Sequence, residues 1–156
     1  MSPDGRSGPR DDRTGGGRQP MSGETDLDVL LASMQPMLRE GEFVFCSLDR
    51  EPNIAEMTAA LATFRETEGT TLVVAAADAS GLGLASSGAM ACITLTVHSS
   101  LDAVGLTAAV ATCLTDAGIS CNVIAAFHHD HLFVPTDRAA DAIAALTALS
   151  AGSTTM

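Results

Sequence analysis

Apolar and polar residues alternate in two different rhythms along the second half of the chain. Ile93, Leu95 and Val97 occupy every second position, which is typical of a strand with one buried face. After this strand the same reasoning predicts four more elements: a helix over 106–117 closed by Gly118, strands over 119–127 and 132–135 joined by a turn at 128–131, and a helix over 139–149. The order strand, helix, strand, strand, helix predicts a small unit of mixed α and β structure.

The same order is fainter in the first half. A helix is expected over 27–34, starting after the cap-like Asp26 and limited by Pro36, and a strand over 43–48. Residues 54–65 have helical spacing, but residues 61–75 could instead form a hairpin. We favour a short helix followed by a hairpin, with one more helical turn between residues 77 and 84.

The second unit lacks room for a closing strand. Only seven small or polar residues follow Leu149, so no strand can follow the last helix within its own unit. The missing strand must come from elsewhere in the chain. We therefore expect each half to lend a strand to the sheet of the other half, which would join the two into one interlocked body.

Composition and charge restrict the partners. The 156 residues include eight Arg and no Lys, against nineteen acids, and the formal net charge is −11. Before Asp26 four Arg balance four acids, so the region expected to fold carries the whole negative excess. Such a surface repels phosphate backbones and anionic lipid head groups, so we expect neither nucleic acid nor membrane binding.

The cysteines and the chain ends indicate location and organisation. Cys46, Cys92, Cys113 and Cys121 form no C-x-x-C pair and lie in apolar runs, as expected of buried thiols in a reducing, cytoplasmic protein. No apolar run is long enough to span a membrane. Residues 1–24 are rich in Gly, Pro, Ser, Arg and Asp and are expected to be a disordered tail, so translation could start at Met1 or at Met21. The predicted organisation after this tail has three parts: an N-terminal unit with a leading helix at 25–88, a C-terminal unit at 89–150 and a flexible tail at 151–156.

A known family matches the loop between the first strand and first helix of the second unit. Residues 93–106 run from a strand through a polar loop into a helix, with Asp102, Val104 and Gly105 where the ACT domain has an acid, a small or Pro residue and a glycine. The stretch resembles an ACT domain. With residues 118–124 and 129–135 it is similar to a bacterial subgroup of stand-alone tandem ACT proteins, itself similar to the ACT tandem of cytosolic arginine sensors. The resemblance covers about 27–149, strongly after Cys92, and Val104 departs from the frequent Pro.

The resemblance implies an α+β fold: tandem ACT-like, ferredoxin-like βαββα units with antiparallel sheets packed against helices. It also implies regulatory binding of an amino acid between this loop and a neighbouring unit. The expected ligand-binding residues are His98, Ser99, Ser100, Leu101, Asp102, Val104, Gly105, Leu106, Asn122 and Ile124.

The residues themselves suggest how such a loop could bind. Gly105 allows a close backbone approach, and free amides at the start of the helix can receive a carboxylate. Asp102 could accept an ammonium group, but the loop could equally cap the helix without any ligand. Asn122 and Ile124 project from one face of their strand, where they could face a neighbouring unit or make a sheet contact.

His128, His129, Asp130 and His131 are the most tempting chemical group, because imidazoles and carboxylates bind Zn²⁺ or Ni²⁺. Contiguous residues of an extended turn point in alternating directions, so we favour a structural turn over a metal site. His98, Ser99 and Asp102 also fail as a catalytic group, since two of them are sequential and nothing activates a nucleophile. We expect no enzyme, no cofactor and no metal.

The sequence thus predicts a non-enzymatic regulatory protein that binds an amino acid or similar small metabolite. Its partner would be a second copy of the chain or an unidentified regulated protein. The alternative is a ligand-free interaction or oligomerisation module that pairs through an exposed sheet edge or helix face.

Overall fold

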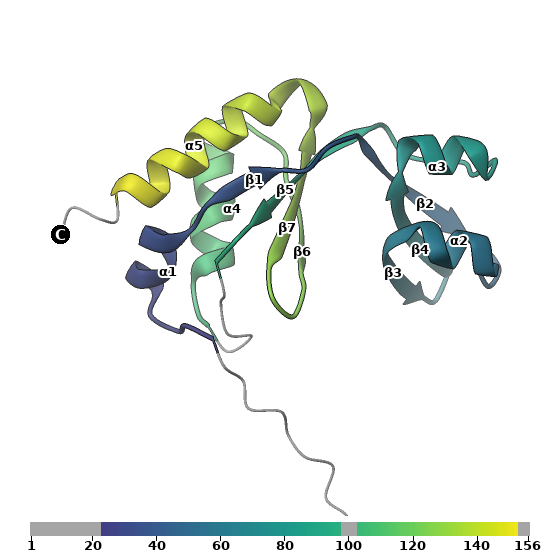
Figure 1. The fold of residues 1–156 in the computed structure, drawn as a ribbon, viewed down its shortest axis with the longest axis horizontal. Helices are drawn as coiled ribbons and strands as arrows, with labels where there is room; N and C mark the ends of the chain where they lie inside the picture. The colour runs from purple at the N-terminus through teal and green to yellow at the C-terminus, as the bar shows by residue number, and fades with distance from the viewer. Residues whose placement is uncertain (1–22, 98–102, 153–156) are drawn as a thin grey trace, which may run out of the picture.

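The computed structural model describes residues 23–97 and 103–152, and these form two lobes joined by extended chain (Figure 1). We call them the N-terminal lobe, which contains β2, β3, β4, α2 and α3, and the C-terminal lobe, which contains α1, β1, β5, α4, β6, β7 and α5. No helix in the described part of the chain is long and apolar enough to cross a membrane.

The C-terminal lobe has three α-helices on one face of its strands. Its elements are α1 (Leu27–Ser33), β1 (Pro36–Leu38), β5 (Met90–Leu95), α4 (Leu106–Asp116), β6 (Asn122–Ala125), β7 (Asp130–Pro135), the short 3₁₀ helix η1 (Thr136–Arg138) and α5 (Ala139–Gly152). Apolar side chains of α1, α4 and α5 meet the inward-facing residues of β5 and β7 in one core. The strand residues of this core occupy every second position, Ala91, Ile93 and Leu95 in β5 and Leu132 and Val134 in β7, so the alternation that predicted β5 also builds the core.

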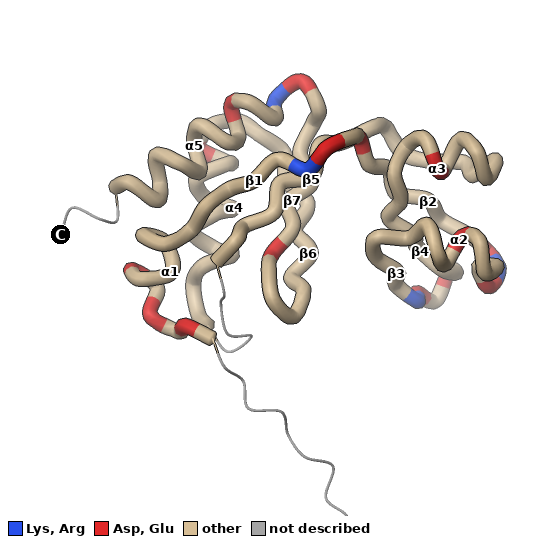
Figure 2. Tube along the Cα trace, viewed as in Figure 1, with Lys and Arg blue, Asp and Glu red and all other residues tan. Residues whose placement is uncertain are grey.

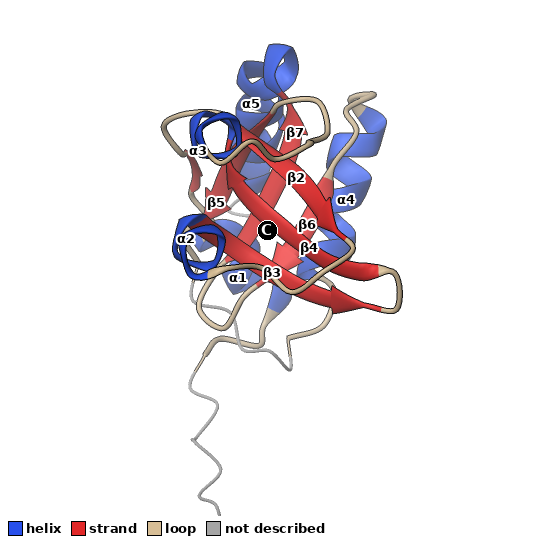
Figure 3. Cartoon of the chain, turned by 90° about the vertical axis from the view of Figure 1, so that its right-hand side faces the viewer, coloured by secondary structure: helices blue, strands red, loops and turns tan. Residues whose placement is uncertain are grey.

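The N-terminal lobe repeats the order on a smaller scale. Its elements are β2 (Phe43–Leu48), α2 (Ile54–Ala59), β3 (Ala60–Glu66), β4 (Gly69–Ala75) and α3 (Ala76–Gly81). Helix α2 starts with a reciprocal capping box: the Asn53 side chain accepts from the Glu56 amide, and the Glu56 carboxylate accepts from the Asn53 amide. Helices α2 and α3 cover the strands of this lobe, as Figure 3 shows from the side of the N-terminal lobe.

All seven strands belong to one antiparallel sheet with the order β3-β4-β2-β5-β7-β6, to which β1 is added beside β5. Strand β1 comes from the first half of the chain but pairs with β5 in the C-terminal lobe, with Met37 opposite Thr94. Hydrogen bonds from the Arg39 amide to the Cys92 carbonyl, at 2.8 Å, and from the Thr96 amide to the Gln35 carbonyl, at 3.0 Å, extend this pairing. The strand missing from the second unit is therefore supplied by residues 36–38.

One direction of the expected exchange is thus confirmed: the first half lends β1 to the sheet of the second half. The reciprocal loan of a full strand was wrong for the described part of the chain. In the other direction, β5 reaches the sheet of the first half through a single pair, Phe43 with Met90. Ser87, which precedes β5, adds two hydrogen bonds to Phe45: its amide donates to the Phe45 carbonyl, and its hydroxyl accepts from the Phe45 amide.

The predicted elements agree with the structure, except at three places. The turn expected over 128–131 is shorter, because Asp130 and His131 already belong to β7 and pair with β5 and β6. The short helix followed by a hairpin is confirmed as α2, β3 and β4. Strand β1 was not predicted, because Pro36 served only as a helix stop and three residues show no alternation. The strand expected over 119–127 is shorter, since Ile119 and Cys121 lie ahead of β6. Ile119 nevertheless faces the core, 4% exposed, where its amide bonds to the Leu114 carbonyl at the end of α4.

Candidate functional site

The loop that the sequence identified is only partly described. His98, Ser99, Ser100, Leu101 and Asp102 lie outside the described residues. The remaining predicted site residues are Val104, Gly105, Leu106, Asn122 and Ile124. They fall on two surfaces of the C-terminal lobe: the start of α4 and the strand β6.

Gly105 is the N-cap of α4, and its backbone is in the left-handed region with φ 103°. No side chain among residues 103–105 caps the helix, and the first bond of the helix runs from the Ala109 amide to the Gly105 carbonyl at 2.9 Å. The amides of the first turn ahead of Ala109 therefore have no partner within the helix. This arrangement can receive an anionic group, as expected of this loop.

The close approach at Gly105 is made by a side chain of this chain itself. A Cβ at Gly105 would lie 3.0 Å from Cδ2 of Leu27, in the first turn of α1. Helix α1 therefore forms one wall of the site, which the sequence did not indicate. Asp26 caps α1, since its carboxylate accepts from the amides of Asp28 and Val29.

The two residues beside Gly105 have opposite surroundings. Val104 is 83% exposed, whereas Leu106 is 3% exposed and packs in the core of the C-terminal lobe. Leu106 therefore anchors the start of α4, and of the two only Val104 is free to meet a ligand.

Asn122 and Ile124 lie on the face of the sheet that the helices of the C-terminal lobe do not cover. Ile124 packs against a third apolar cluster formed where the two lobes meet. Its members come from both lobes: Phe43, Phe45, Ala62, Val73, Met90, Cys92, Ile124 and Phe133. Asn122 is exposed and its amide lies 3.8 Å from the Met90 sulfur. Ile124 thus faces the neighbouring unit, which is one of the two alternatives drawn from the sequence. It lies on a different surface of the lobe from Gly105 at the start of α4.

A small cavity of about 80 Å³ lies beside this junction. Its lining is mostly apolar and comes from β3 on one side and from β6, β7 and the turn after β6 on the other: Leu61, Ala62, Ile124, Ala126, His131 and Phe133. Because ligand pockets typically measure at least about 300 Å³, this space suits a packing defect better than a metabolite.

The histidines lie in the turn from β6 to β7 and in β7 itself, to which His131 belongs, and the contacts of His129 and His131 are structural. The Nδ1 of His131 is 3.0 Å from the Thr94 hydroxyl, and the Nδ1 of His129 is 3.3 Å from the Val97 carbonyl. Burial lowers the pKa of His131, and the charges of Arg39 and His129 lower it further, against the opposing effect of Asp130. Burial also raises the pKa of Asp130, against the opposing effect of the neighbouring imidazoles.

Metal-binding and thiol chemistry find little support among the described residues. Residues 23–97 and 103–152 contain no group of three or more His, Cys, Asp or Glu side chains that could hold a metal ion. All four cysteines are free thiols, and burial raises the pKa of each, that of Cys92 to about 11. A thiol held protonated is a poor nucleophile, which agrees with the expectation of inert core residues.

The structure also contains a larger cavity, of about 340 Å³, at the tip of the N-terminal lobe. Its lining residues come from two separate stretches, 49–51 and 65–70, so no local sequence pattern connects them. The available signal was charge: both stretches alternate Arg with acids at the ends of predicted strands.

Comparisons with known proteins agree with the repeated order of elements. Residues 22–91 match one ACT domain family and residues 88–148 match another. No curated protein matches the chain. A protein of unknown function from Vibrio cholerae, described as a possible transport protein, is 48% identical over 80% of this chain and 95% of its own, with a TM-score of 0.71.

Two more distant solved structures share the fold. A protein from Agrobacterium tumefaciens is 15% identical over 75% of this chain and 89% of its own, with a TM-score of 0.65. The ligand-free regulatory subunit of aspartate kinase from Thermus thermophilus is 8% identical over 76% of this chain and 97% of its own, with a TM-score of 0.57. The two family matches and the near relative from Vibrio cholerae together show that this chain belongs to the ACT domain family, as a tandem of two ACT domains.

Proposed function

We propose that this tandem of ACT domains is a regulatory protein that binds an amino acid or a similar small metabolite at the start of α4. The site would comprise residues 98–102, Val104 and the backbone around Gly105, with the ligand carboxylate on the free amides of α4 and its ammonium group on Asp102. Asn122 and Ile124 would lie where a ligand-induced rearrangement alters the contact between the two lobes.

The observation that carries this proposal is the start of α4, which begins at a glycine beside Leu27 and has no side-chain cap among the described residues. An uncapped helix end exposes amides that either bind water or bind a ligand. Here the wall beside them is α1, which leads within a few residues into β1.

This arrangement offers a route from ligand to output. Strand β1 is paired with β5 in the C-terminal lobe, and the chain then enters β2 in the N-terminal lobe. A ligand that shifts α1 by its contact near Leu27 would act on both sheets, because the same segment belongs to one and leads into the other. Regulation then requires only that the ligand prefer one arrangement of this segment.

The known relatives support regulation more than catalysis. The described residues offer inert thiols and a structural histidine turn, and two similar solved structures are described as regulatory subunits of aspartate kinase. The regulated partner is proposed to be a second copy of the chain or another cytoplasmic protein.

A thermal-shift screen against the twenty amino acids tests the proposal. A ligand at a hundred times its Kd should add about 2.7 kcal/mol to the free energy of unfolding. The shift should disappear in Asp102→Asn and persist in Asp116→Asn, the same change at the far end of α4. If no amino acid or related metabolite gives a shift, the ligand-free interaction module is the better description.

A further inference from the structure

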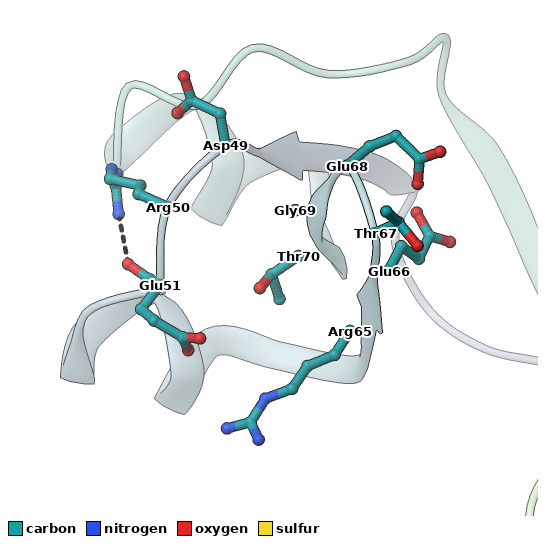
Figure 4. A pocket seen from close by; sticks show the side chains of 9 residues that line it. All are labelled: Asp49, Arg50, Glu51, Arg65, Glu66, Thr67, Glu68, Gly69 and Thr70. Atoms are coloured by element: carbon teal, nitrogen blue, oxygen red, sulfur yellow. Dashed lines mark hydrogen bonds between the residues drawn. The ribbon is translucent and has the colours of Figure 1, made fainter.

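The cavity at the tip of the N-terminal lobe is built from two chain segments (Figure 4). One is the loop from β2 to α2, which contributes Asp49, Arg50 and Glu51. The other is the hairpin of β3 and β4, which contributes residues 65–70. The volume of about 340 Å³ is within the range of small-molecule sites.

One of the two arginines around the cavity is already neutralised. The Arg50 guanidinium donates two hydrogen bonds to the Glu56 carboxylate, at 2.7 and 2.9 Å, and a third to the Glu51 carbonyl at 3.1 Å. Glu56 is 2% exposed and also accepts from the Asn53 amide. This bidentate pair fixes the loop that forms one wall, and it leaves Arg65 as the cation available to a ligand.

Thr70 is the feature that points to a ligand. It is 4% exposed, and it lies at the centre of the ring of lining side chains (Figure 4). Its hydroxyl has no hydrogen-bond partner among the residues that the structure describes. In the described chain, every buried side-chain N or O atom has either a partner or some contact with solvent. The hydroxyl is therefore open to the cavity. A hydroxyl that has no partner in the fold and opens into a cavity is free to donate to and accept from a molecule bound there.

The charges around Thr70 indicate what that ligand carries. Four carboxylates line the cavity, Asp49, Glu51, Glu66 and Glu68, and Glu66 already accepts from the Thr71 hydroxyl at 3.0 Å. Arg65 is the positive charge that can offset these carboxylates, because Arg50 is already paired with Glu56. No three acidic side chains of the described chain converge on one point as a metal ion would require. Separated carboxylates suit a molecule whose positive charges are themselves separated.

We propose that this cavity is a second binding site, for a small organic molecule with two ammonium groups, whose polar atoms bind Glu51 and neighbouring carboxylates and the Thr70 hydroxyl. Such a molecule could be a simple diamine or a diamino acid, and Arg65 distinguishes them, because only a diamino acid has a carboxylate to offer it. The site lies in the opposite lobe from Gly105 and does not depend on the amino-acid site proposed above.

Calorimetric titration of the full chain with 1,4-diaminobutane, L-ornithine and L-lysine tests the inference. At least one probe should bind, and its affinity should fall as salt is added, because the contacts are between charges. Thr70→Val should weaken binding about threefold to tenfold, since it deletes one hydrogen bond and keeps the shape of the side chain. Glu51→Gln should weaken it by a similar factor, whereas the matched control Glu40→Gln, in the turn between β1 and β2, should not change it.

The variants also separate the two ligand sources. Arg65→Gln should weaken L-ornithine or L-lysine but not 1,4-diaminobutane if the natural ligand is a diamino acid. Thr70→Val should keep the unfolding temperature of the unliganded protein, because the hydroxyl has no bond to lose, so lost binding cannot be ascribed to misfolding. Failure of all three probes to bind at millimolar concentration, or binding unchanged by both Thr70→Val and Glu51→Gln, would overturn the inference. Asp102→Asn should leave the titrations unchanged, so this site and the amino-acid site can fail separately.

Discussion

The ring of Phe45 in β2 meets the ring of Phe133 in β7 edge to face, with centroids 5.3 Å apart and planes at 79°. Phe43 also meets the Phe133 ring edge to face, with centroids 6.2 Å apart and planes at 75°. Phe133 belongs to the C-terminal lobe and the other two to the N-terminal lobe, so the aromatic contacts join lobes whose strands share only the Phe43 and Met90 pair at this point. Charged positions gather elsewhere, at the lobe tips and along the connecting chain (Figure 2).

Phe133→Ala should destabilise both lobes together. The side chain is 1% exposed, and removing it leaves a cavity in the cluster shared by the lobes, so we expect a loss of about 3–5 kcal/mol in the free energy of unfolding. Circular dichroism and hydrogen exchange of amides in both lobes should report one common transition in the wild-type chain. Phe127→Ala, at a residue 49% exposed, should change stability by about 0.5 kcal/mol or less. Separate transitions for the two lobes in the wild-type chain would contradict the interlocked description.

Arg39→Pro should weaken the pairing of the lent strand. The Arg39 amide donates to the Cys92 carbonyl at 2.8 Å, just beyond β1, and proline cannot make this bond. We expect a loss of about 2 kcal/mol in urea unfolding. Arg39→Ala keeps the amide and removes only an exposed guanidinium, which lies over the Phe43 ring at 5.7 Å, so it should cost about 1 kcal/mol or less. Equal losses in both variants would show that the side chain, not the strand, matters.

Local patterns predicted most of this fold because each element carries its own signal. Alternation defined β5, a short β-favouring run defined β2, and helical spacing with Gly118 defined α4. Strand β1 has no such signal: Met37 and Leu38 are 56% and 54% exposed, and only their pairing with β5 makes them a strand. The need for a lent strand could be deduced from the short C-terminal tail, but the identity of that strand is a tertiary fact.

Gly105→Ala should destabilise the protein more than Gly118→Ala. Both glycines have positive φ, 103° and 66°, so each substitution should cost about 1–2 kcal/mol from backbone strain. At Gly118 nothing lies within 4 Å of an added Cβ, whereas at Gly105 it meets Leu27 Cδ2 at 3.0 Å. The excess cost at Gly105 should shrink in a Leu27→Ala background, measured by a double-mutant cycle. An excess that persists there would mean that Leu27 is not its cause.

The candidate sites were less predictable than the fold. A loop motif in the sequence predicted Gly105 as a site residue. The contact with Leu27 could not be predicted, because it depends on the packing of α1. It could not find the cavity around Thr70, because Glu51 and Arg65 meet only after β2, β3 and β4 pair. Residues distant in sequence form a site only through tertiary structure, and no spacing rule connects them.

The four thiols should react slowly with iodoacetamide in the native protein. Burial raises the pKa of each, so little thiolate is present near neutral pH. Cys92, with a pKa of about 11 and no exposure, should be the slowest, and the half-buried Cys113 and Cys121 should be faster. Peptide mapping by mass spectrometry gives the order, with urea-unfolded protein as the control in which all four react. Fast labelling of Cys92 in the native state would show that β5 opens readily.

Stability should fall in acid as Glu56 is protonated. The Arg50 guanidinium and the Asn53 amide bind its carboxylate and lower its pKa from 4.5 to about 2. Because the folded pKa is depressed, the unfolded chain takes up the proton first, so the contribution of this group is complete above about pH 4.5 and is lost as the pH falls toward 2. Glu56→Gln removes the titration, and its unfolding temperature should vary less with pH across this range than that of the wild-type chain. Glu40→Gln, at an exposed position, should keep the wild-type pH profile, and a Glu56→Gln profile parallel to wild type would contradict the assignment.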